Sequence, residues 1–330
     1  RRTGLSLSTI SKYLNGGNVR EENRLAIDAA IEELDYSVNV FARSLKANRS
    51  MTIGVLLPTI SSPFFGRVVA AMEPVLRRSG YECFVCSYDF DREQELKKLE
   101  FLARYHVDGI VYVPENVTAG EVRARVGAIP VVLIDRSLDQ ADYDTVVVDN
   151  LNAVYMAIEL LIGRGHRRIG RFGGISSFYD PSNWNSVNRE NAFRSQLAAH
   201  GLEPELYATN TGSTPSTIEA VKSLLDRGAT ALVTVNEGLE LETLHALNVL
   251  GVRVPDEVAL LSWTQPNPAG FVRPSISGIE QNFEELVRQS CETFRRLLAG
   301  EPAGDTLIDY RLQIRESSAK SVAAKGGGRK

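Results

Sequence analysis

The sequence has 330 residues, of which 43% are hydrophobic and 24% are charged, with a formal net charge of −4. This composition is typical of soluble globular domains, and the length suggests two or three of them. No apolar run is long enough to span a membrane and no signal-peptide pattern opens the chain, so we expect a cytoplasmic protein without membrane contact.

The three cysteines, Cys83, Cys86 and Cys291, argue against a disulfide framework because their number is odd in a large chain. Cys83 and Cys86 have the CxxC spacing, but the run CFVC fits the alternation of a strand better. No second pair and no nearby His supports a metal or redox site, so we expect no metal and no cofactor.

The charges of the first fifty residues are arranged in blocks. Residues 1–20 carry four basic and no acidic side chains, residues 36–50 carry three basic and none acidic, and the six acidic groups lie in between. Two basic segments around an acidic helix indicate surfaces that contact phosphate, rather than a uniformly basic domain.

Residues 6–15, SLSTISKYLN, are predicted to form a short helix that the Ser6 hydroxyl can cap. Leu7, Ile10 and Leu14 recur at helical spacing and give it an apolar side that would seek a core. The other sides carry hydroxyls, one amide and one cation, which suit phosphates and base edges: Ser8, Thr9, Ser11, Lys12 and Asn15. From these ten residues alone, a plain amphipathic surface helix is the alternative.

A turn at Gly16-Gly17 is followed by a second predicted helix over residues 21–34. Its apolar side comprises Leu25, Ile27, Ala30, Ile31 and Leu34. Two short helices bury little surface, so the pair needs a further partner. Residues 37–50 are basic and poor in turn residues, which predicts a linker able to form a short helix.

From Met51 onward strands alternate with helices, which predicts parallel sheets with helices on both faces. The first set of elements is expected at 51–58, 64–79, 82–87, 93–105, 109–113, 119–126, 130–135 and 145–149. The second set is expected at 153–164, 169–172, 186–200, 206–209, 216–225, 231–235, 239–250 and 258–262. Late elements at 276–279, 283–299 and 306–314 should return to both units.

Two similar α/β units with shared late segments should enclose a cleft, where ligands bind at the carboxyl ends of the strands. The polar residues at these ends are Ser61, Ser62, Asp135, Asn236 and Thr264. They show no nucleophile–base pair and no metal-ligand spacing, so they favour binding over catalysis.

Several other residues have a structural reading beside a functional one. His166 lies in a turn between helix and strand, where a local hydrogen bond is favoured over a role as a catalytic base. Trp184, near Arg189, either stacks on a ligand or packs between the two units. Phe64 and Phe65 follow a Pro at a strand end, and one of them is expected to face the cleft because two adjacent rings cannot both face inward.

Ordered motifs along residues 3–318 resemble the LacI/GalR family of bacterial transcription repressors. The motifs are GLSLSTISKYLNG, AIEELDY, ARSL, IGVLLPTISSPFF, GYECFVC, VDGIV, PVVLIDR, LIGRGHRRIG, GVRVPDEVALLS and the closing RES. The resemblance implies a DNA-binding helix-turn-helix headpiece, a hinge helix and a core similar to periplasmic sugar-binding proteins. It also implies a homodimer on operator DNA, controlled by a small effector in the cleft, and no enzyme activity.

On this resemblance the fold class is α/β, with two similar doubly wound parallel-sheet subdomains after a truncated headpiece and a hinge helix. The expected segments are the headpiece at 1–36, the hinge at 37–50, the effector-binding core at 51–319 and a disordered tail at 320–330. The first subdomain would take residues 51–149 and 280–303, and the second would take 150–279 and 304–319.

The resemblance also implies roles for single residues. Base edges in the major groove would be read by Leu7, Ser8 and Lys12, and phosphates would be contacted by Ser6, Thr9, Ser11 and Asn15. Leu45 matches the hinge leucine that enters the minor groove at the operator centre. The family's effector positions match Ser62, Phe64, Phe65, Asp135, Arg189, Asn236, Thr264 and Gln281.

The chain departs from the family pattern at three places. The family's first helix is absent, since RRTG stands where its end should be, so we expect the natural N-terminus to lie upstream. Ser62 replaces the usual Asn before PFF. In the run SWTQ, Thr264 replaces the aspartate that grips sugar hydroxyls.

The loss of that aspartate changes the expected effector. Arg189 is retained and Arg273 lies in a loop that could border the cleft, so we predict a sugar acid or sugar phosphate rather than a neutral sugar. Asp135 would repel an anion unless it grips hydroxyls at the opposite end. The alternative function, a solute-binding component of a sugar transporter, would require a signal peptide and no helix-turn-helix remnant.

Overall fold

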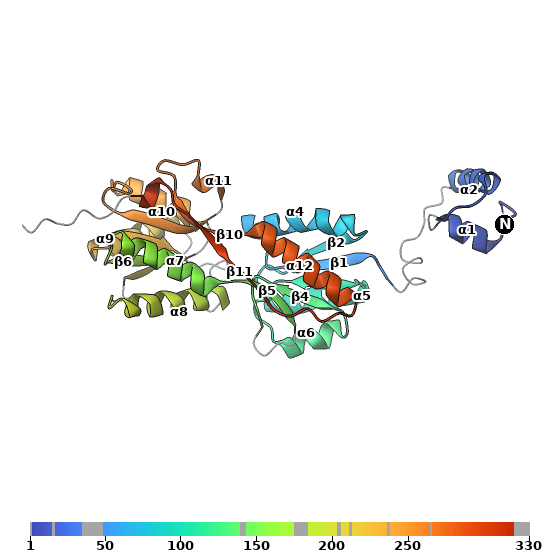
Figure 1. The fold of residues 1–330 in the computed structure, drawn as a ribbon, viewed down its shortest axis with the longest axis horizontal. Helices are drawn as coiled ribbons and strands as arrows, with labels where there is room; N and C mark the ends of the chain where they lie inside the picture. Colours follow the sequence, from blue (N-terminus) through green and yellow to red (C-terminus); the bar gives the residue numbers. More distant parts are fainter. Residues whose placement is uncertain are drawn as a thin grey trace, which may run out of the picture. The chain divides into compact units, whose positions relative to one another are not determined.

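The computed structural model describes residues 2–14, 17–34, 49–138, 143–174, 184–202, 206–210, 213–235, 238–264 and 266–319. The chain forms two compact units, Arg1–Met51 and Thr52–Lys330, whose elements are labelled in Figure 1. None of the helices in these ranges is both long and apolar enough to cross a membrane. Three predicted site residues, Asn15, Leu45 and Asn236, lie outside the described residues, as do the side chains of Trp184 and Thr264.

In the first unit, α1 (Leu7–Leu14) and α2 (Glu21–Glu33) form as predicted. Ser6 caps α1, because its Oγ accepts a hydrogen bond from the Thr9 backbone N–H at 3.2 Å. The Tyr13 hydroxyl donates to Asp28 Oδ1 at 2.5 Å and so ties α1 to α2.

Three residues of the expected apolar sides of these helices are exposed. Leu7 is 86% exposed, Leu25 is 60% exposed and Leu34 is 55% exposed, whereas Ile27 is buried. Within the described residues of this unit, Leu7, Leu25 and Leu34 are therefore not covered by a core. Two short helices offer too little surface to cover three more apolar side chains.

The first sheet of the second unit has the strand order β11-β5-β4-β3-β1-β2, and its neighbours pair in parallel. Its strands are β1 (Thr52–Leu57), β2 (Glu82–Ser87), β3 (Gly109–Tyr112), β4 (Val131–Ile134), β5 (Asp144–Val148) and β11 (Thr306–Ile308). The helices α4 (Pro63–Arg78) and α12 (Phe283–Leu298) pack against each other, as do α5 (Arg92–Arg104) and α6 (Ala119–Val126). Figure 1 shows these two pairs on opposite faces of the sheet.

The second sheet has the order β12-β10-β9-β8-β6-β7, with β12 antiparallel to β10 and the other pairs parallel. Its strands are β6 (Ile169–Gly174), β7 (Tyr207–Asn210), β8 (Ala231–Thr234), β9 (Ala259–Thr264), β10 (Ser277–Gln281) and β12 (Tyr310–Gln313). Its long helices are α7 (Asn150–Gly163), α8 (Trp184–Ala199), α9 (Thr214–Asp226) and α10 (Leu239–Val249). The α/β fold class with two doubly wound sheets is confirmed, and the sequence did not predict the short α11 (Pro266–Ala269) and η1 (Glu316–Ser318).

The chain passes between the sheets three times, before α7, before α12 and between β11 and β12. The late element expected over 306–314 consists of two strands, and the expectation that the late elements return to both units is confirmed. Leu307 pairs with Val147 in the first sheet, whereas Leu312 pairs with Ile279 in the second.

These pairings also move the expected subdomain limits. The last crossing lies at Asp309, so residues 306–308 join the first sheet, although 304–319 were assigned to the second subdomain. Glu280 and Gln281 pair with β12 in the second sheet, although 280–303 were assigned to the first. The alternation of apolar and polar residues over 308–314 continues across Asp309 and does not indicate that crossing.

Candidate functional site

A buried polar cluster lies where the two sheets of the second unit meet. It contains Asp135, Asn150, Asn185, Arg189 and Tyr310, each of them at most 8% exposed. Asp135 follows β4 of the first sheet, Tyr310 begins β12 of the second, and the other three come from the N-terminal parts of α7 and α8. We call these five residues the interdomain cluster.

Arg189 is held by the chain on several sides. Its Nε donates to Asn150 Oδ1 at 2.7 Å, its Nη1 donates to the Val235 carbonyl at 2.7 Å, and its Nη2 donates to the Tyr310 hydroxyl at 2.9 Å. The guanidinium carbon also lies 4.7 Å from the ring centroid of Trp263. Among the described residues, three of its five N–H groups have a hydrogen-bond partner.

The carboxylate of the cluster is connected to Arg189 through two amides. Asn150 Nδ2 donates to Asn185 Oδ1 at 2.7 Å, and Asn185 Nδ2 donates to Asp135 Oδ2 at 3.0 Å. Burial raises the pKa of Asp135 from 3.8 to about 6, against the lowering influence of the Arg189 charge and of the Gln281 and Asn185 amides. The carboxyl is therefore mostly ionised above neutral pH.

A second ion pair borders Asp135 on the side of the first sheet. Arg136 Nε lies 3.6 Å from Asp135 Oδ2, and the same guanidinium pairs with Glu115, which follows β3. The side chains of both partners of this pair are buried. The Asp135 carboxylate is thus close to the Arg136 guanidinium, which follows it in the chain. It is connected to the Arg189 guanidinium indirectly, through hydrogen bonds of Asn185 and Asn150.

The aromatic residues predicted for the cleft occupy other places. Phe64 and Phe65 are 8% and 5% exposed, so the expectation that two adjacent rings cannot both face inward is wrong. Phe64 contacts the rings of both Phe65 and Phe283, with centroids 5.0 and 5.2 Å apart. They begin a helix, where neighbouring side chains diverge by about 100° and not by the 180° of a strand, so both can be buried. Ser62 precedes them and is half-buried.

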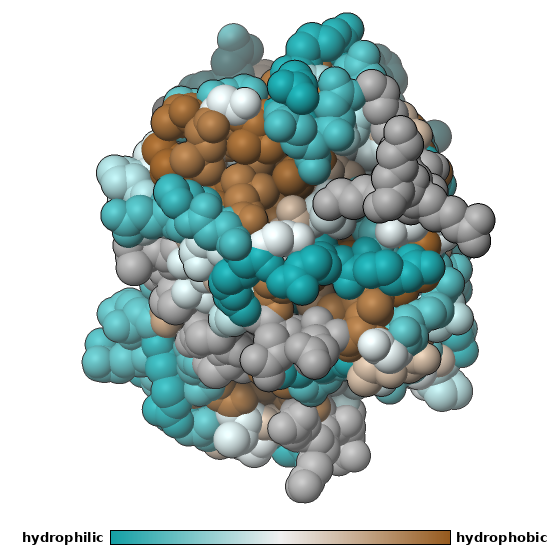
Figure 2. Space-filling model, turned by 90° about the vertical axis from the view of Figure 1, so that its left-hand side faces the viewer, coloured by the Kyte–Doolittle hydropathy of each residue, from teal (hydrophilic) through white to brown (hydrophobic). Residues whose placement is uncertain are grey.

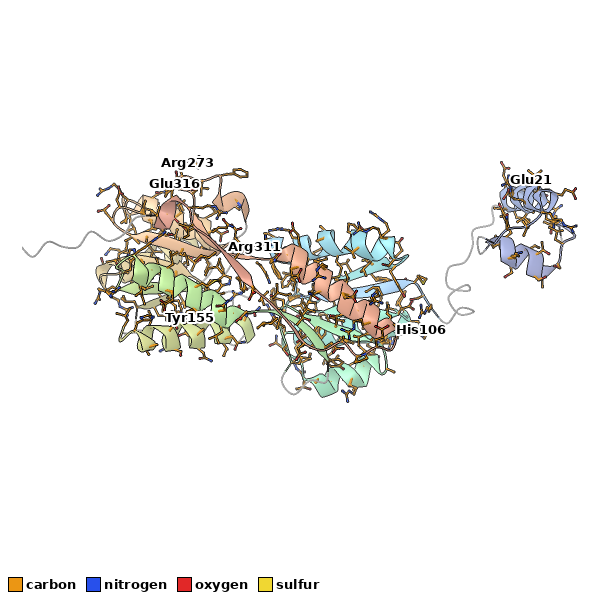
Figure 3. The ribbon with its side chains drawn as sticks, in the orientation of Figure 1. Glu21, His106, Tyr155, Arg273, Arg311 and Glu316 are labelled. Atoms are coloured by element: carbon orange, nitrogen blue, oxygen red, sulfur yellow. The ribbon has the colours of Figure 1, made fainter. Side chains whose placement is uncertain are left out.

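Arg273 does not join the interdomain cluster, which corrects the expectation that its loop borders the cleft. It lies before the N-terminal end of β10, whereas Gln281 marks the opposite end of that strand. Arg273 is exposed, and its Nη1 lies 4.0 Å from Glu316 Oε2, as their positions in Figure 3 indicate. Of the two arginines expected at the cleft, Arg189 lies in the interdomain cluster and Arg273 does not.

His166 has the structural role expected from its position in a turn. It is buried, and its Nδ1 lies 3.1 Å from Thr230 Oγ1. Burial and the Arg164 charge lower its pKa. Among the described residues no group of three or more His, Cys, Asp or Glu side chains could hold a metal ion.

The surface of α1 presents the side chains that were predicted to contact DNA. Leu7, Ser8 and Lys12 are exposed, as is the capping residue Ser6. Thr9 and Ser11 are half-buried. Leu7 is not packed against the described residues of its unit. Its exposure suits a residue that contacts a base edge.

Four residues of the site were missed by sequence reasoning. Asn150 is the second residue after the end of β5, so the rule that polar strand ends line the site could have found it. Trp263 immediately precedes Thr264 in the unusual run SWTQ, which was a second available signal. Asn185 and Tyr310 carried no signal, because their partners lie far away in the sequence.

The chain is similar to known proteins along nearly its whole length. Residues 158–318 match the family described as periplasmic binding protein-like domain. The chain is 31% identical to the HTH-type transcriptional regulator PtxS of Pseudomonas aeruginosa over 324 residues. This alignment covers 96% of this chain and 93% of PtxS. It is 25% identical to catabolite control protein A of Priestia megaterium, with coverage of 96% and 97%.

Solved structures show the same fold. The Lac repressor dimer bound to operator and the anti-inducer ONPF matches with a TM-score of 0.84 at 21% identity, over 96% of both chains. A periplasmic binding protein/LacI transcriptional regulator from Alkaliphilus metalliredigens, complexed with D-xylulofuranose, matches with a TM-score of 0.70 at 24% identity. That match covers 83% of this chain and 100% of the other.

Proposed function

The chain belongs to the LacI/GalR family of transcription regulators, and on this basis we propose that it is a sequence-specific DNA-binding repressor controlled by a small carbohydrate-like effector. The observation that carries the proposal is the 31% identity to a transcriptional regulator over 96% of the chain, headpiece and core together. A transport protein would share the core alone, so this similarity removes the solute-binding alternative. A regulator that binds operator DNA acts in the cytoplasm, which is where we place this protein.

The proposed DNA interface is the exposed surface of α1. Leu7, Ser8 and Lys12 would meet base edges, while Ser6, Thr9, Ser11 and Asn15 would contact phosphates. Leu45 would enter the minor groove at the operator centre. The charge layout supports this assignment. Phosphates attract the basic residues of segments 1–20 and 36–50 and repel the acidic residues of α2, which lies between these segments in the sequence.

The proposed assembly is a homodimer whose two headpieces bind a pseudo-palindromic operator. Figure 2 views the chain from the end of Figure 1 that carries α9 and α10, and it shows apolar side chains gathered beside a band of hydrophilic ones. Phe271 and Val249 in the second subdomain are 78% and 57% exposed, and Val85 on the edge strand β2 is 38% exposed. The proposal of a homodimer is supported by the likeness to the Lac repressor dimer bound to operator, because a two-fold assembly presents two headpieces to two half-sites.

Lys12→Ala is expected to relax base preference at one position in each half-site, by about 1–3 kcal/mol, because an ammonium that contacts a base edge discriminates among bases. The measurement is a gel-shift selection from randomised operators, on a chain that includes the family's first headpiece helix. Arg24→Ala on α2, whose side chain pairs with Glu21 at 2.8 Å, is the matched control and should leave the preference unchanged. Relaxation in one half-site alone would contradict the dimer, and unchanged preference would contradict the role of Lys12.

The proposed effector is a polyol with one acidic end, such as a sugar acid or sugar phosphate. Arg189, three of whose N–H groups have a partner among the described residues, would donate to a carboxylate or phosphate, and Thr264 replaces the family's cleft aspartate. Asp135 would accept hydroxyl donors at the other end, together with Gln281 and the half-buried Ser62. Asn236, Phe64 and Phe65 complete the proposed set by their match to the family's positions.

Calorimetry with an aldose and its aldonic acid tests the acidic end. We expect the acid to bind at least about tenfold more tightly, since a charge-assisted pair with Arg189 contributes more than a neutral hydrogen bond. The pair differs only at the first carbon, so the neutral sugar is its own control. Binding of neutral sugars without binding of their acids would overturn the acidic effector while leaving the regulator itself intact.

A further inference from the structure

The hydrogen bonds between Arg189 and Asp135 have a fixed direction. An arginine only donates and an ionised carboxylate only accepts. Arg189 therefore faces Asn150 Oδ1, which turns Asn150 Nδ2 toward Asn185 Oδ1, which in turn leaves Asn185 Nδ2 for Asp135 Oδ2. Neither amide can flip without placing two donors or two acceptors face to face. We call these four residues the amide chain.

The amide chain joins structural elements that belong to different sheets. Asp135 follows β4 of the first sheet, and Asn150 begins α7 just after the chain leaves that sheet. Asn185 and Arg189 lie on α8, and Arg189 is bound to Val235 after β8 and to Tyr310 in β12, both in the second sheet. The chain of hydrogen bonds thus ties the two subdomains together.

The tie is buried along its whole length. Asp135, Asn150, Asn185 and Arg189 are 5%, 3%, 7% and 8% exposed. Water cannot readily replace a broken bond at such a depth, so a donor or acceptor that loses its partner is left unsatisfied unless the subdomains separate. Whether a hydrogen bond of the amide chain is formed or broken is therefore coupled to the relative position of the two sheets.

We propose that Asn150 and Asn185 are positioning residues that hold the two subdomains together in the ligand-free chain and fix the hydrogen-bond polarity of the effector site. Because the amide chain accepts at Asp135 and donates at Arg189, an effector must donate to the first and accept from the second. This consequence for the effector rests on the proposed function, whereas the tie itself does not.

Asn185→Asp tests the tie with almost no change of shape. It replaces the donor that faces Asp135 by an acceptor, so two carboxylates oppose each other and the bond between the subdomains is lost. Adding Asp135→Asn supplies a donor from the opposite side, and the bond can re-form in the reverse direction while Asn150 still donates to position 185. A direction-dependent tie therefore predicts that the second substitution repairs the first.

The measurement is hydrogen–deuterium exchange by mass spectrometry on the whole ligand-free chain, without DNA. Asn185→Asp is expected to raise exchange about tenfold in segments 131–138 and 306–313, and the double variant should return it to within about twofold of the starting chain. Asn152→Asp is the matched control, since this exposed residue of α7 adds the same charge outside the amide chain and should change nothing.

Asn150→Asp is a second variant for the case in which Asn185→Asp unfolds the core. It keeps the acceptor for Arg189 but loses the donor to Asn185, and Asp135→Asn should repair it as well, because both amide bonds can then run in reverse. Exchange equal to that of the starting chain in both single variants would overturn the proposal, as would failure of Asp135→Asn to repair either. Since neither effector nor DNA is present, failure of the proposed function would not alter this result.

Discussion

Arg189→Met is expected to lower the free energy of unfolding of the core by about 3–5 kcal/mol, the range found when one partner of a buried charged network is removed. Methionine keeps most of the length and apolar stem of the side chain. It removes the donors to Asn150, Val235 and Tyr310, as well as the contact with the Trp263 ring.

The loss is large because the groups left behind are buried. Asn150 Oδ1 would keep only the longer contact from the Tyr310 hydroxyl, at 3.4 Å. The Arg189 charge also lowers the pKa of Asp135, so its removal raises that pKa further above 6 and makes the ionised form more costly at neutral pH. Below the folded-state pKa the carboxyl is protonated, so this part of the loss should shrink as the pH falls through 6.

Urea denaturation of the variant at pH 7.5 and pH 5.5 measures both effects. Arg194→Met is the matched control, because Arg194 lies on the same helix but its side chain is 55% exposed and pairs with Glu190 at 2.5 Å. An exposed pair of this kind is expected to contribute less than about 1 kcal/mol. Equal losses for the two variants would contradict the role assigned to the Arg189 network.

Gly109→Ala is expected to destabilise the first subdomain by about 3 kcal/mol through overpacking. An added Cβ would lie 2.2 Å from Cζ and 2.3 Å from Cε2 of Phe294, on α12. The backbone cannot yield, since β3 is paired with β1 on one side and with β4 on the other. The Phe294 ring, only 1% exposed, would have to leave its place in the core.

Thermal denaturation compares this variant with Gly120→Ala in α6, where no atom lies within 4 Å of the added Cβ. That control should be neutral or stabilising by up to about 1 kcal/mol, because alanine favours a helix over glycine. Adding Phe294→Leu should recover part of the Gly109→Ala loss by freeing space. A melting temperature for Gly109→Ala equal to that of the control would show that α12 does not pack on β3 in this way.

The sequence by itself determined the order and type of most elements, because their signals are local. Apolar runs between helices of amphipathic pattern indicated the parallel sheets, and α6 spans the predicted residues 119–126. Its Thr118 and Glu121 form a capping box, which depends on four successive residues alone. The place of Asp135 at a strand end likewise followed from the general rule for parallel sheets.

The tertiary structure decided how distant segments meet at the site. The Arg189 guanidinium and the Tyr310 hydroxyl are hydrogen-bonded across 121 residues of sequence. No periodicity links two such positions, and the crossing at Asp309 that sends Tyr310 into the second sheet lies within a regular alternation of apolar and polar residues.

The same limit explains why Arg273 was misplaced and Asn185 was missed. Arg273 lies near Thr264 in the sequence, but β10 runs between its loop and the interdomain cluster, so proximity along the chain did not become proximity in space. Asn185 is an ordinary polar residue on a helix until α8 packs beside Asp135 and Asn150. Hydrogen-bond direction depends on which donor faces which acceptor, and only the folded arrangement of the two sheets decides that.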